Sequence, residues 1–435
     1  MAKGQIVAGI DIGTSKICTI IASVSPETDR VNVIGVSSHE SAGLRKSQIV
    51  DIEDAINSIT ESVEAAERMA GLSLSKVFVT IGGSHIESQN SKGVVAVSEP
   101  EGEIIPEDVT RVIEAARAVS MPASREIIHV IPREFMVDSQ AGIKDPIGMT
   151  GVRLEAEAHI VTASSTASRN LTKCISEIGI DIESQVFAGL ASAQSTISDT
   201  ERELGVVLVD IGAGSTSICV FAEGSLAHSA VLPIGARNIT NDLAIGMRVS
   251  LASAETIKKS LGQTPIKVVP TDNAEDREKR IARKRKEDEL DLTKLGLKED
   301  IRAASRKTLT EGIIRPRLNE IFQMVGRELK KSGYGGATPA GVVLTGGGAE
   351  TVGIIDACKR TLSLPTRLGV PQGLSGLIDE IEAPAYAASV GLIQFAVSNG
   401  AKGGAGNFGS AVGSSRFSGK GLLQKMTAFA KSFLP

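Results

Sequence analysis

Apolar residues recur along this chain with two different periods. Mostly apolar runs typical of strands include Val31 to Val36, Val77 to Ile81 and Ala340 to Leu344. Between the first two, Asp51 precedes a helical pattern that stops at Gly71, with apolar residues at Ile52, Ala55, Ile56, Ile59, Val63, Ala66 and Ala70. Strands that alternate with amphipathic helices predict mixed sheets covered by helices, an α/β fold.

The pattern changes between about His85 and Ala158, which indicates an inserted unit. It predicts strands at Val94–Val97, Ile127–Ile131, Glu134–Val137 and Arg153–Val161, and a helix at Pro106–Val119. Asp145–Gly151 is a turn-rich loop without a catalytic cluster. We interpret this unit as a small α+β subdomain that serves interaction.

The second half of the chain is predicted to be mainly helical around a few strands. A strand is expected at Ala230–Ile234. Helices are expected at Ser164–Gly179, Glu183–Thr196, Asn238–Ile245, from Ser253 onward, Leu309–Lys330 with an interruption at Pro316, Val352–Thr361 and Ala383–Val397.

Two short stretches share one unusual pattern. Ile10-Asp11-Ile12-Gly13 and Val209-Asp210-Ile211-Gly212 each end an apolar strand with a carboxylate, and small or hydroxyl residues and a second strand follow. Such a turn presents backbone N–H groups that can hold a phosphate. Two matched turns about 200 residues apart predict a duplicated fold whose hairpins face one another across a cleft.

The two hairpins carry the predicted phosphate contacts. Backbone amides and hydroxyls would bind the phosphates, and Lys16 would add a positive charge. Asp11 and Asp210 would be repelled by phosphate oxygens, so we expect Mg²⁺ between them, bound through water. The alternative for either aspartate is a turn-forming side chain. The predicted phosphate-binding residues are Asp11, Gly13, Thr14, Ser15, Lys16, Asp210, Gly212, Gly214, Ser215 and Thr216.

A third glycine-rich turn follows the buried strand at Ala340–Leu344. Gly346, Gly347 and Gly348 would let a flat ligand lie on the backbone, which suggests where a nucleoside binds. Glu255 and Lys258 share one helix face at a spacing of three, and on spacing alone they form a solvated ion pair. No Walker motif is present, and the sequence identifies no group that would orient a water for hydrolysis.

Composition narrows the class of protein. With 435 residues, 42% of them hydrophobic, the chain can bury more than one core, and a net charge of -4 argues against a dedicated nucleic-acid binder. Its four cysteines lie far apart, which predicts buried thiols in a reducing compartment. No signal peptide and no window long enough for a spanning helix is visible, so we expect a cytoplasmic chain.

Two polar or flexible stretches interrupt the globular pattern. Charges of both signs crowd residues 271–296, which predicts a solvated excursion, although its basic cluster could meet anionic lipid or an acidic partner. Residues 399–420 are rich in Gly, Ser and Ala and predict a linker. Gly404, Gly406 and Gly409 match a dinucleotide motif, but no strand precedes them.

The last fifteen residues form an amphipathic helical pattern. Bulky apolar residues fill one arc and lysines flank it, which favours binding to a membrane surface over packing on the chain's own domain. The predicted membrane residues are Leu422, Leu423, Lys425, Met426, Phe429, Lys431 and Phe433.

The two hairpins and Leu344-Thr345-Gly346-Gly347-Gly348 resemble the phosphate and adenosine motifs of the actin, DnaK-chaperone and sugar-kinase superfamily. The Asp145–Glu155 run, the Gly9–Lys16 stretch and the terminal helix resemble one branch, the FtsA family of bacterial cell-division proteins. That resemblance implies an actin-like ATPase fold with two lobes, ATP and Mg²⁺ as ligands, and nucleoside contacts from Glu255, Lys258 and the three glycines.

The resemblance also implies partners. They are the C-terminal tail of FtsZ, a second copy of the chain in a filament, an anionic membrane surface, and later division proteins bound by the inserted unit. Arg317 matches a family position implicated in FtsZ contact, and Arg302 and Lys307 are its expected neighbours. The function implied is anchoring of FtsZ at the cytoplasmic face of the membrane at the division site. Two alternatives remain open, a PilM-like pilus assembly protein and a small-molecule kinase of the same superfamily.

We expect the following division of the chain. Lobe 1 comprises 1–84 and 161–204, and the inserted subdomain spans 85–160. Lobe 2 has its core at 205–235, an outer subdomain at 236–338, and the nucleoside loop and closing helix at 339–398. A linker at 399–420 leads to the terminal helix at 421–435.

Overall fold

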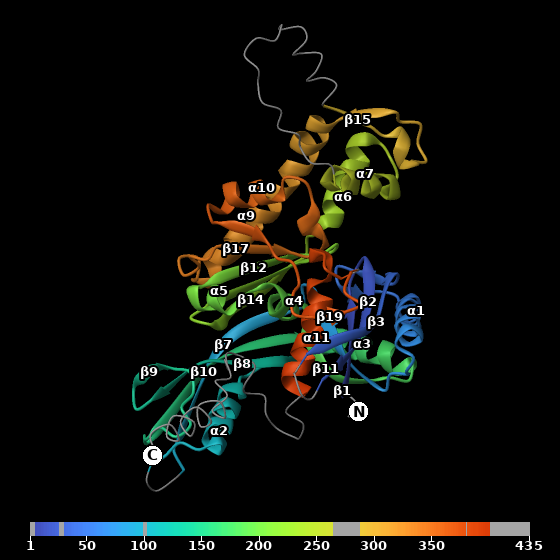
Figure 1. The fold of residues 1–435 in the computed structure, drawn as a ribbon. Helices are drawn as coiled ribbons and strands as arrows, with labels where there is room; N and C mark the ends of the chain where they lie inside the picture. The colour runs from blue at the N-terminus through green and yellow to red at the C-terminus, as the bar shows by residue number, and fades with distance from the viewer. Residues whose placement is uncertain (1–4, 26–29, 99–101, 264–287, 380, 401–435) are drawn as a thin grey trace, which may run out of the picture.

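The computed structural model describes residues 5–25, 30–98, 102–263, 288–379 and 381–400. Within these ranges the chain forms three larger sheets, two of which belong to lobes that lie side by side, while the third projects to one side (Figure 1). The predicted linker, terminal helix and most of the charged run lie outside the described residues.

The first lobe is built on a mixed six-stranded sheet. Its strand order is β11 (Asp181–Phe187), β6 (Lys76–Ile81), β1 (Gln5–Ile12), β2 (Lys16–Val24), β3 (Val31–Glu40) and β19 (Ser375–Gly376). Both faces are apolar because helices cover both. Ile17 and Ile21 point to the face covered by α1 (Ile52–Ala70) and α3 (Ser165–Glu177), whereas Ile20 points to α11 (Ala387–Gly400).

Helix α1 begins and ends at the predicted residues. The Asp51 carboxylate accepts hydrogen bonds from the backbone N–H groups of Glu53 and Asp54, which would otherwise lack partners. Gly71 ends the helix in the left-handed conformation, with φ of 69°, where glycine has no Cβ to strain.

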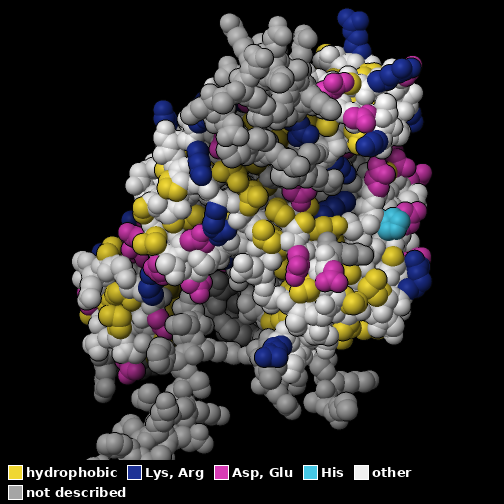
Figure 2. All heavy atoms as spheres, turned by 45° about the horizontal axis from the view of Figure 1, so that its top comes forward, with side chains coloured by type: hydrophobic (Ala, Val, Ile, Leu, Met, Phe, Trp, Pro, Cys, Tyr) yellow, Lys and Arg dark blue, Asp and Glu magenta, His cyan; other side chains and the backbone are white. Residues whose placement is uncertain are grey.

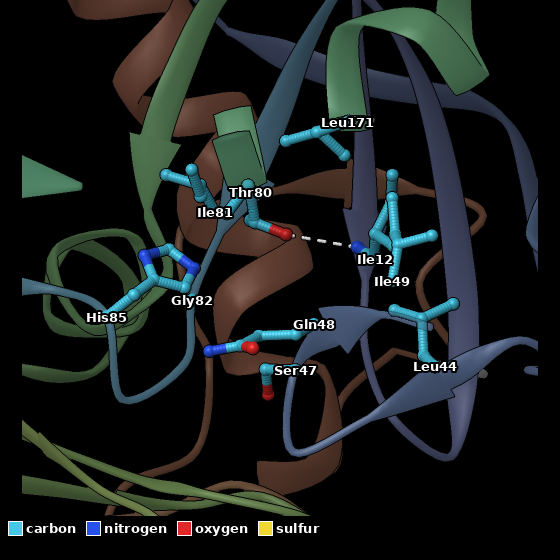
Figure 3. Close-up of a pocket in the computed structure, with 11 residues that line it drawn as sticks. Ile12, Leu44, Ser47, Gln48, Ile49, Thr80, Ile81, Gly82, His85 and Leu171 are labelled. Carbon is cyan, nitrogen blue, oxygen red and sulfur yellow. Dashed lines mark hydrogen bonds between the residues drawn. The ribbon is translucent and has the colours of Figure 1, made fainter. Parts of the chain in front are cut away.

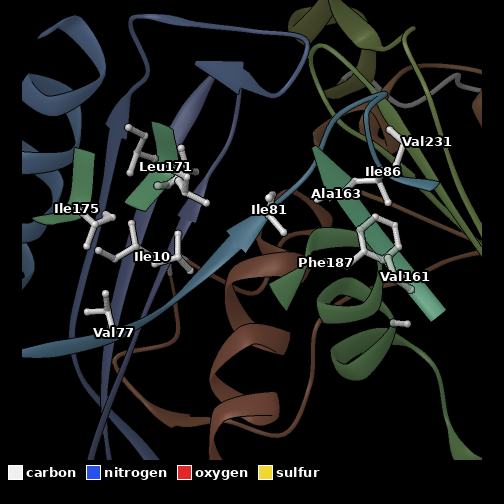
Figure 4. Packing of buried hydrophobic residues seen from close by; sticks show 14 of the residues in the cluster. Ile10, Val77, Ile81, Ile86, Val161, Ala163, Leu171, Ile175, Phe187 and Val231 are labelled. Atoms are coloured by element: carbon white, nitrogen blue, oxygen red, sulfur yellow. The ribbon is translucent and has the colours of Figure 1, made fainter. Parts of the chain in front are cut away.

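One prediction for this lobe is wrong. The segment expected as a helix from Glu183 to Thr196 begins as strand β11, and only Ala188–Thr196 forms a helix, α4. Ile182, Val186 and Phe187 fit either period, and parallel pairing with β6 decides for a strand. Figure 4 shows Phe187 in the large core, which continues from Ile10 to Val161 and Val231.

The third sheet, the inserted sheet, has the order β7 (Glu87–Ala96), β10 (Arg153–Ser164), β8 (Arg125–Val137) and β9 (Gln140–Ile143). Helix α2 (Pro106–Arg117) packs on it around Val112 and Ala116. Two expected strands, Ile127–Ile131 and Glu134–Val137, are one continuous strand, β8. The expected gap coincides with a register shift in the pairing with β10, between Glu157 and Ala158, where Arg133 has no partner in the register.

The second lobe repeats the arrangement of the first. Its sheet has the order β14 (Ser225–Leu232), β13 (Thr216–Ala222), β12 (Val206–Ile211), β17 (Val342–Thr345) and β18 (Thr366–Leu368). Val206 and Leu208 face the core shared with lobe 1, and Val207 and Val209 face lobe 2's own helices. These helices are α6 (Ala236–Met247), α7 (Leu251–Gln263), α9 (Arg315–Ser332) and α10 (Ile354–Leu362), and the short α5 (Asp199–Leu204) precedes the sheet.

The expected interruption at Pro316 takes the form of a π-helical segment, η2 (Thr308–Ile314), which runs directly into α9. The Arg315 N–H reaches back five residues to the Thr310 carbonyl. Pro316 has no N–H and would clash with the carbonyl of Gly312 in a regular helix, so the wider turn relieves that contact.

The remaining short elements complete the described chain. They are β4 (Leu44–Arg45), β5 (Gln48–Ile49), β15 (Glu289–Asp291), η1 (Thr293–Leu295), β16 (Ala303–Ser305), η3 (Gly347–Glu350) and η4 (Pro384–Tyr386). All four cysteines are buried and none of them forms a disulfide bond, as predicted. None of the helices in the described ranges is long and apolar enough to span a membrane.

Candidate functional site

The two Asp-Ile-Gly hairpins have the same geometry. In the first, Ile12 pairs with Ile17, and the Gly13 N–H donates to the Lys16 carbonyl at 3.0 Å. In the second, Ile211 pairs with Thr216, and the Gly212 N–H donates to the Ser215 carbonyl at 2.9 Å. Equal turns at equal positions in two lobes are what a duplicated phosphate site requires.

The hairpins meet at their tips. A Cβ added to Gly214 would lie 2.8 Å from the Thr14 hydroxyl oxygen and 2.9 Å from Lys46 Cα, so the backbone here must stay bare. Ser47 bridges the two turns, because its N–H donates to Thr14 Oγ1 at 2.8 Å and its hydroxyl lies 2.8 Å from Ser215 Oγ. The structure thus brings Thr14, Ser215 and Gly214 together.

Each hairpin aspartate is held by serine or threonine hydroxyls. Asp11 accepts from Thr80 at 2.7 Å and from Ser389 at 2.9 Å, and Asp210 accepts from Ser192 at 2.6 Å. Burial raises the pKa of Asp210 to about 6, and the nearby Asp11 charge adds to the rise. The two carboxylates provide oxygen ligands of the kind that Mg²⁺ takes, directly or through water.

Lys16 is enclosed beside these carboxylates. Its Nζ lies 2.9 Å from the ring centroid of Tyr386, and burial lowers its pKa, an effect that nearby acidic groups including Asp11 and Asp210 oppose. A buried ammonium beside an aromatic face is stabilised by any further anion that enters. Ser15 of the same turn is exposed, and Thr216 donates to the Ile234 carbonyl, away from the hairpin tip.

The glycine turn after β17 packs on the second hairpin. A Cβ at Gly346, whose φ is 81°, would overlap the Asp210 carboxylate, and one at Gly348 would overlap Ile211. Gly347 is exposed, and a Cβ added to it would lie 3.7 Å from Ala385 Cβ, an ordinary van der Waals contact. This arrangement leaves one bare backbone surface at Gly347 beside the hairpin.

Glu255 and Lys258 face each other in a hydrogen-bonded group. The Lys258 ammonium donates to Glu255 at 2.7 Å and to Thr240 Oγ1 at 2.9 Å, and Thr240 donates to Glu255 at 2.6 Å. Burial raises the pKa of Glu255, but the Lys258 charge and these hydrogen bonds outweigh it and hold the pKa below its usual value. Thr240 lies on α6 one helical turn after Ala236, and the Ala236 N–H donates to the Gly212 carbonyl. The group therefore lies one helical turn from the second hairpin.

The predicted partner residues do not form one cluster with free charges. Arg317 makes two hydrogen bonds to Asp242, at 2.6 and 2.8 Å, and also pairs with Glu320, so its charge is largely used within the chain. Arg302 and Lys307 are exposed. Figure 2 shows basic and acidic side chains interspersed on the face that carries this outer region.

Several residues at the site escaped the sequence analysis. Ser47, Thr80, Ser192, Ser389 and Tyr386 contact the hairpins from distant parts of the chain. Only Thr80 had a local signal, since it is the second-last residue of the strand predicted at Val77–Ile81, which runs into two glycines. The predicted membrane residues from Leu422 to Phe433 lie outside the described residues.

The fold and the paired hairpins define an actin-like protein. Among solved structures, the PilM–PilN type IV pilus biogenesis complex is similar, with a TM-score of 0.62 and 16% identity over 90% of this chain and 98% of that one. MreB5 of Spiroplasma citri bound to ADP is also similar, with a TM-score of 0.51 and 12% identity over 92% of this chain and 99% of that one. These likenesses establish the predicted fold class.

Sequence comparison then identifies the family. Residues 83–162 match the SHS2 domain inserted in FtsA, and residues 207–391 match the cell division protein FtsA family. The chain is 37% identical to the cell division protein FtsA of Pseudomonas aeruginosa over 90% of this chain and 89% of that protein. It is 38% identical to that of Bacillus subtilis over 92% and 85%. The chain belongs to the FtsA family of cell division proteins, as its motifs indicated. This membership favours neither the PilM-like alternative nor the small-molecule kinase.

Proposed function

We propose that the two hairpins bind the phosphates of ATP with Mg²⁺. The observation that carries this proposal is the equal geometry of the two turns, which meet at their tips in an actin-like fold. Gly13 and Gly212 close the two turns with their own N–H groups, so the bare backbone at Gly214 and the residues at the tips of the turns would supply the donors, and Thr14 and Ser215 add hydroxyls at the same point. Ser15, Lys16 and Thr216 belong to the same turns.

Asp11 and Asp210 are the residues that would hold Mg²⁺ through water. Their oxygens and the hydroxyls on them match the ligands that this ion prefers. When bound, Mg²⁺ would offset the charge of the phosphates. The nucleoside would lie along Gly346, Gly347 and Gly348 and against Glu255 and Lys258, one helical turn beyond the second hairpin.

We further propose that the chain anchors FtsZ filaments to the cytoplasmic face of the membrane at the division site. Family membership and the amphipathic pattern of 421–435 support this role. Arg302, Lys307 and Arg317 would contact the FtsZ C-terminal tail, and the inserted sheet would contact later division proteins. Self-association would give many weakly bound terminal helices a collective avidity for lipid.

Co-sedimentation with liposomes tests this role. The full chain and a version ending at Asn399 are compared on anionic vesicles with ATP, with and without FtsZ. We expect only the full chain to pellet, to carry FtsZ with it, and to lose binding with Phe429→Glu, because a charge cannot enter the acyl region at low cost. If both versions stay in solution, the tether proposal is wrong.

A further inference from the structure

A short hairpin of lobe 1 reaches in between the two phosphate hairpins. Strands β4 and β5 pair antiparallel and are joined by Lys46 and Ser47, whose φ values are 51° and 59°. Left-handed residues with a side chain cost roughly 1–2 kcal/mol each, and turns of this type usually contain Asn-Gly. Such a turn persists where its surroundings hold it in place.

Both phosphate hairpins hold this turn. Ser47 donates its N–H to Thr14, and its hydroxyl lies 2.8 Å from Ser215 Oγ and 3.4 Å from Thr14 Oγ1. Lys46 Cα packs on Gly214 so closely that a methyl group there would not fit. The base of the turn is fixed as well, because the Val50 N–H donates to the Gly43 carbonyl at 2.8 Å.

The contacts place three hydroxyl groups at one point, from Thr14, Ser47 and Ser215. Each hydroxyl has one hydrogen to donate, and here they donate to one another. A phosphate oxygen is a stronger acceptor than a hydroxyl, because hydrogen bonds to an ionised group are about twice as strong as neutral ones. A phosphate at the hairpin tips would therefore take the Ser47 hydrogen.

We propose that Ser47 is a further phosphate-binding residue, which contacts the terminal phosphate of a nucleoside triphosphate. This inference rests on the proposed nucleotide site. The groups assigned to the nucleoside, Glu255, Lys258 and the glycines at 346–348, all belong to lobe 2. The β4–β5 turn enters from lobe 1 and meets the hairpin tips, so it takes the end of the phosphate chain away from the nucleoside.

The turn also contacts the connection that leads from β6 into the inserted sheet. A Cβ at Gly83 would lie 3.2 Å from the Gln48 side chain and from the carbonyl oxygens of Lys46 and Ser47. In Figure 3, Ser47 and Gln48 share one small cavity with Gly82 and His85. The His85 carbonyl in turn accepts from Arg125 of β8 at 2.9 Å. A shift of the turn therefore presses on the strand connection that leads into the inserted sheet.

The test uses the full chain and compares its affinity for Mg-ATP and Mg-ADP by isothermal titration. Ser47→Gly keeps the backbone N–H and suits the positive φ, so it removes the hydroxyl without straining the turn. We expect about tenfold weaker ATP binding, the size of one hydrogen bond to a charged group, and little change for ADP. Ser47→Asn, which tolerates this conformation and keeps a donor, should recover part of the loss. Ser38→Ala, an exposed serine on β3, is the matched control.

Hydrogen exchange in residues 82–88 tests the contact with the inserted sheet. Saturating ATP should slow exchange there in the unmodified chain more than ADP does, and Ser47→Gly should abolish the difference. Equal losses for ATP and ADP, or none, would overturn the assignment of Ser47 while leaving the nucleotide site intact. If the unmodified chain binds neither nucleotide, the proposed nucleotide site itself is wrong, and the role of Ser47 falls with it.

Discussion

Replacing Asp210 by asparagine should stabilise the protein in the absence of nucleotide at neutral pH. The Asp210 carboxylate lies at the end of β12 with one hydroxyl donor, Ser192, and with Asp11 nearby, and burial raises its pKa to about 6 from an ordinary 3.8. A carboxyl group whose pKa is raised in the folded state contributes its full stabilisation below about pH 3.8, its ordinary pKa in the unfolded chain. That contribution is lost as the pH rises through about 6.

The magnitude follows from the shift. About two pKa units correspond to roughly 3 kcal/mol at most. Because the Asp210 side chain keeps some exposed surface, solvent screening reduces the expected value to about 1–2 kcal/mol. Asparagine keeps an acceptor for the Ser192 hydroxyl and carries no charge. The free energy of unfolding of the Asp210→Asn variant therefore lacks this dependence on pH.

Urea denaturation at pH 4.5 and 7.5, without nucleotide or Mg²⁺, measures this effect. The free energy of unfolding of Asp210→Asn, relative to the unmodified chain, should rise by about 1–2 kcal/mol between the two pH values. Asp356→Asn, an exposed position on α10, should show no such rise. If the difference between Asp210→Asn and the unmodified chain is the same at both pH values, the carboxylate is not destabilised by burial.

Three further results are expected. Gly346→Ala should lower the free energy of unfolding in urea by roughly 2–4 kcal/mol, because its methyl group meets Asp210. Gly353→Ala, also left-handed but with open space around it, should cost only about 1 kcal/mol. Lys258→Met should weaken ATP binding about tenfold in isothermal titration, and unchanged affinity would remove Lys258 from the site. Finally, burial lowers the pKa of His129 to about 4. The free energy of unfolding should therefore fall by up to about 3 kcal/mol when the pH drops from 6.5 to 4, and His129→Gln should reduce that fall.

Local sequence patterns predicted those parts of the fold that local forces determine. Asp51 and Gly71 mark the ends of α1 because a side-chain cap and a left-handed glycine act within one helical turn. The two Asp-Ile-Gly hairpins were predicted for the same reason. The strand at 181–187 was missed because pairing with β6, a hundred residues away in sequence, overrides an ambiguous apolar pattern.

The contacts around the candidate site were harder to predict. Ser47 lies 33 residues from Thr14 and 168 from Ser215, and its turn contains neither glycine nor asparagine to reveal it. Ser389 reaches Asp11 from 378 residues away. Single serines carry no pattern, so only the folded chain brings them to the hairpins. The roles assigned to the hairpin residues in nucleotide binding stay predictions.

The most direct test of the central claim, that both hairpins hold one Mg-ATP, is a double-mutant cycle on ATP affinity. Asp11→Asn, Asp210→Asn and the double variant are titrated with ATP in Mg²⁺ and in EDTA. If both carboxylates hold the same ion through water, each single variant should lose most of the dependence on Mg²⁺, and the double variant should lose little more. Additive losses, or Mg²⁺ dependence that survives in the double variant, would contradict a shared site.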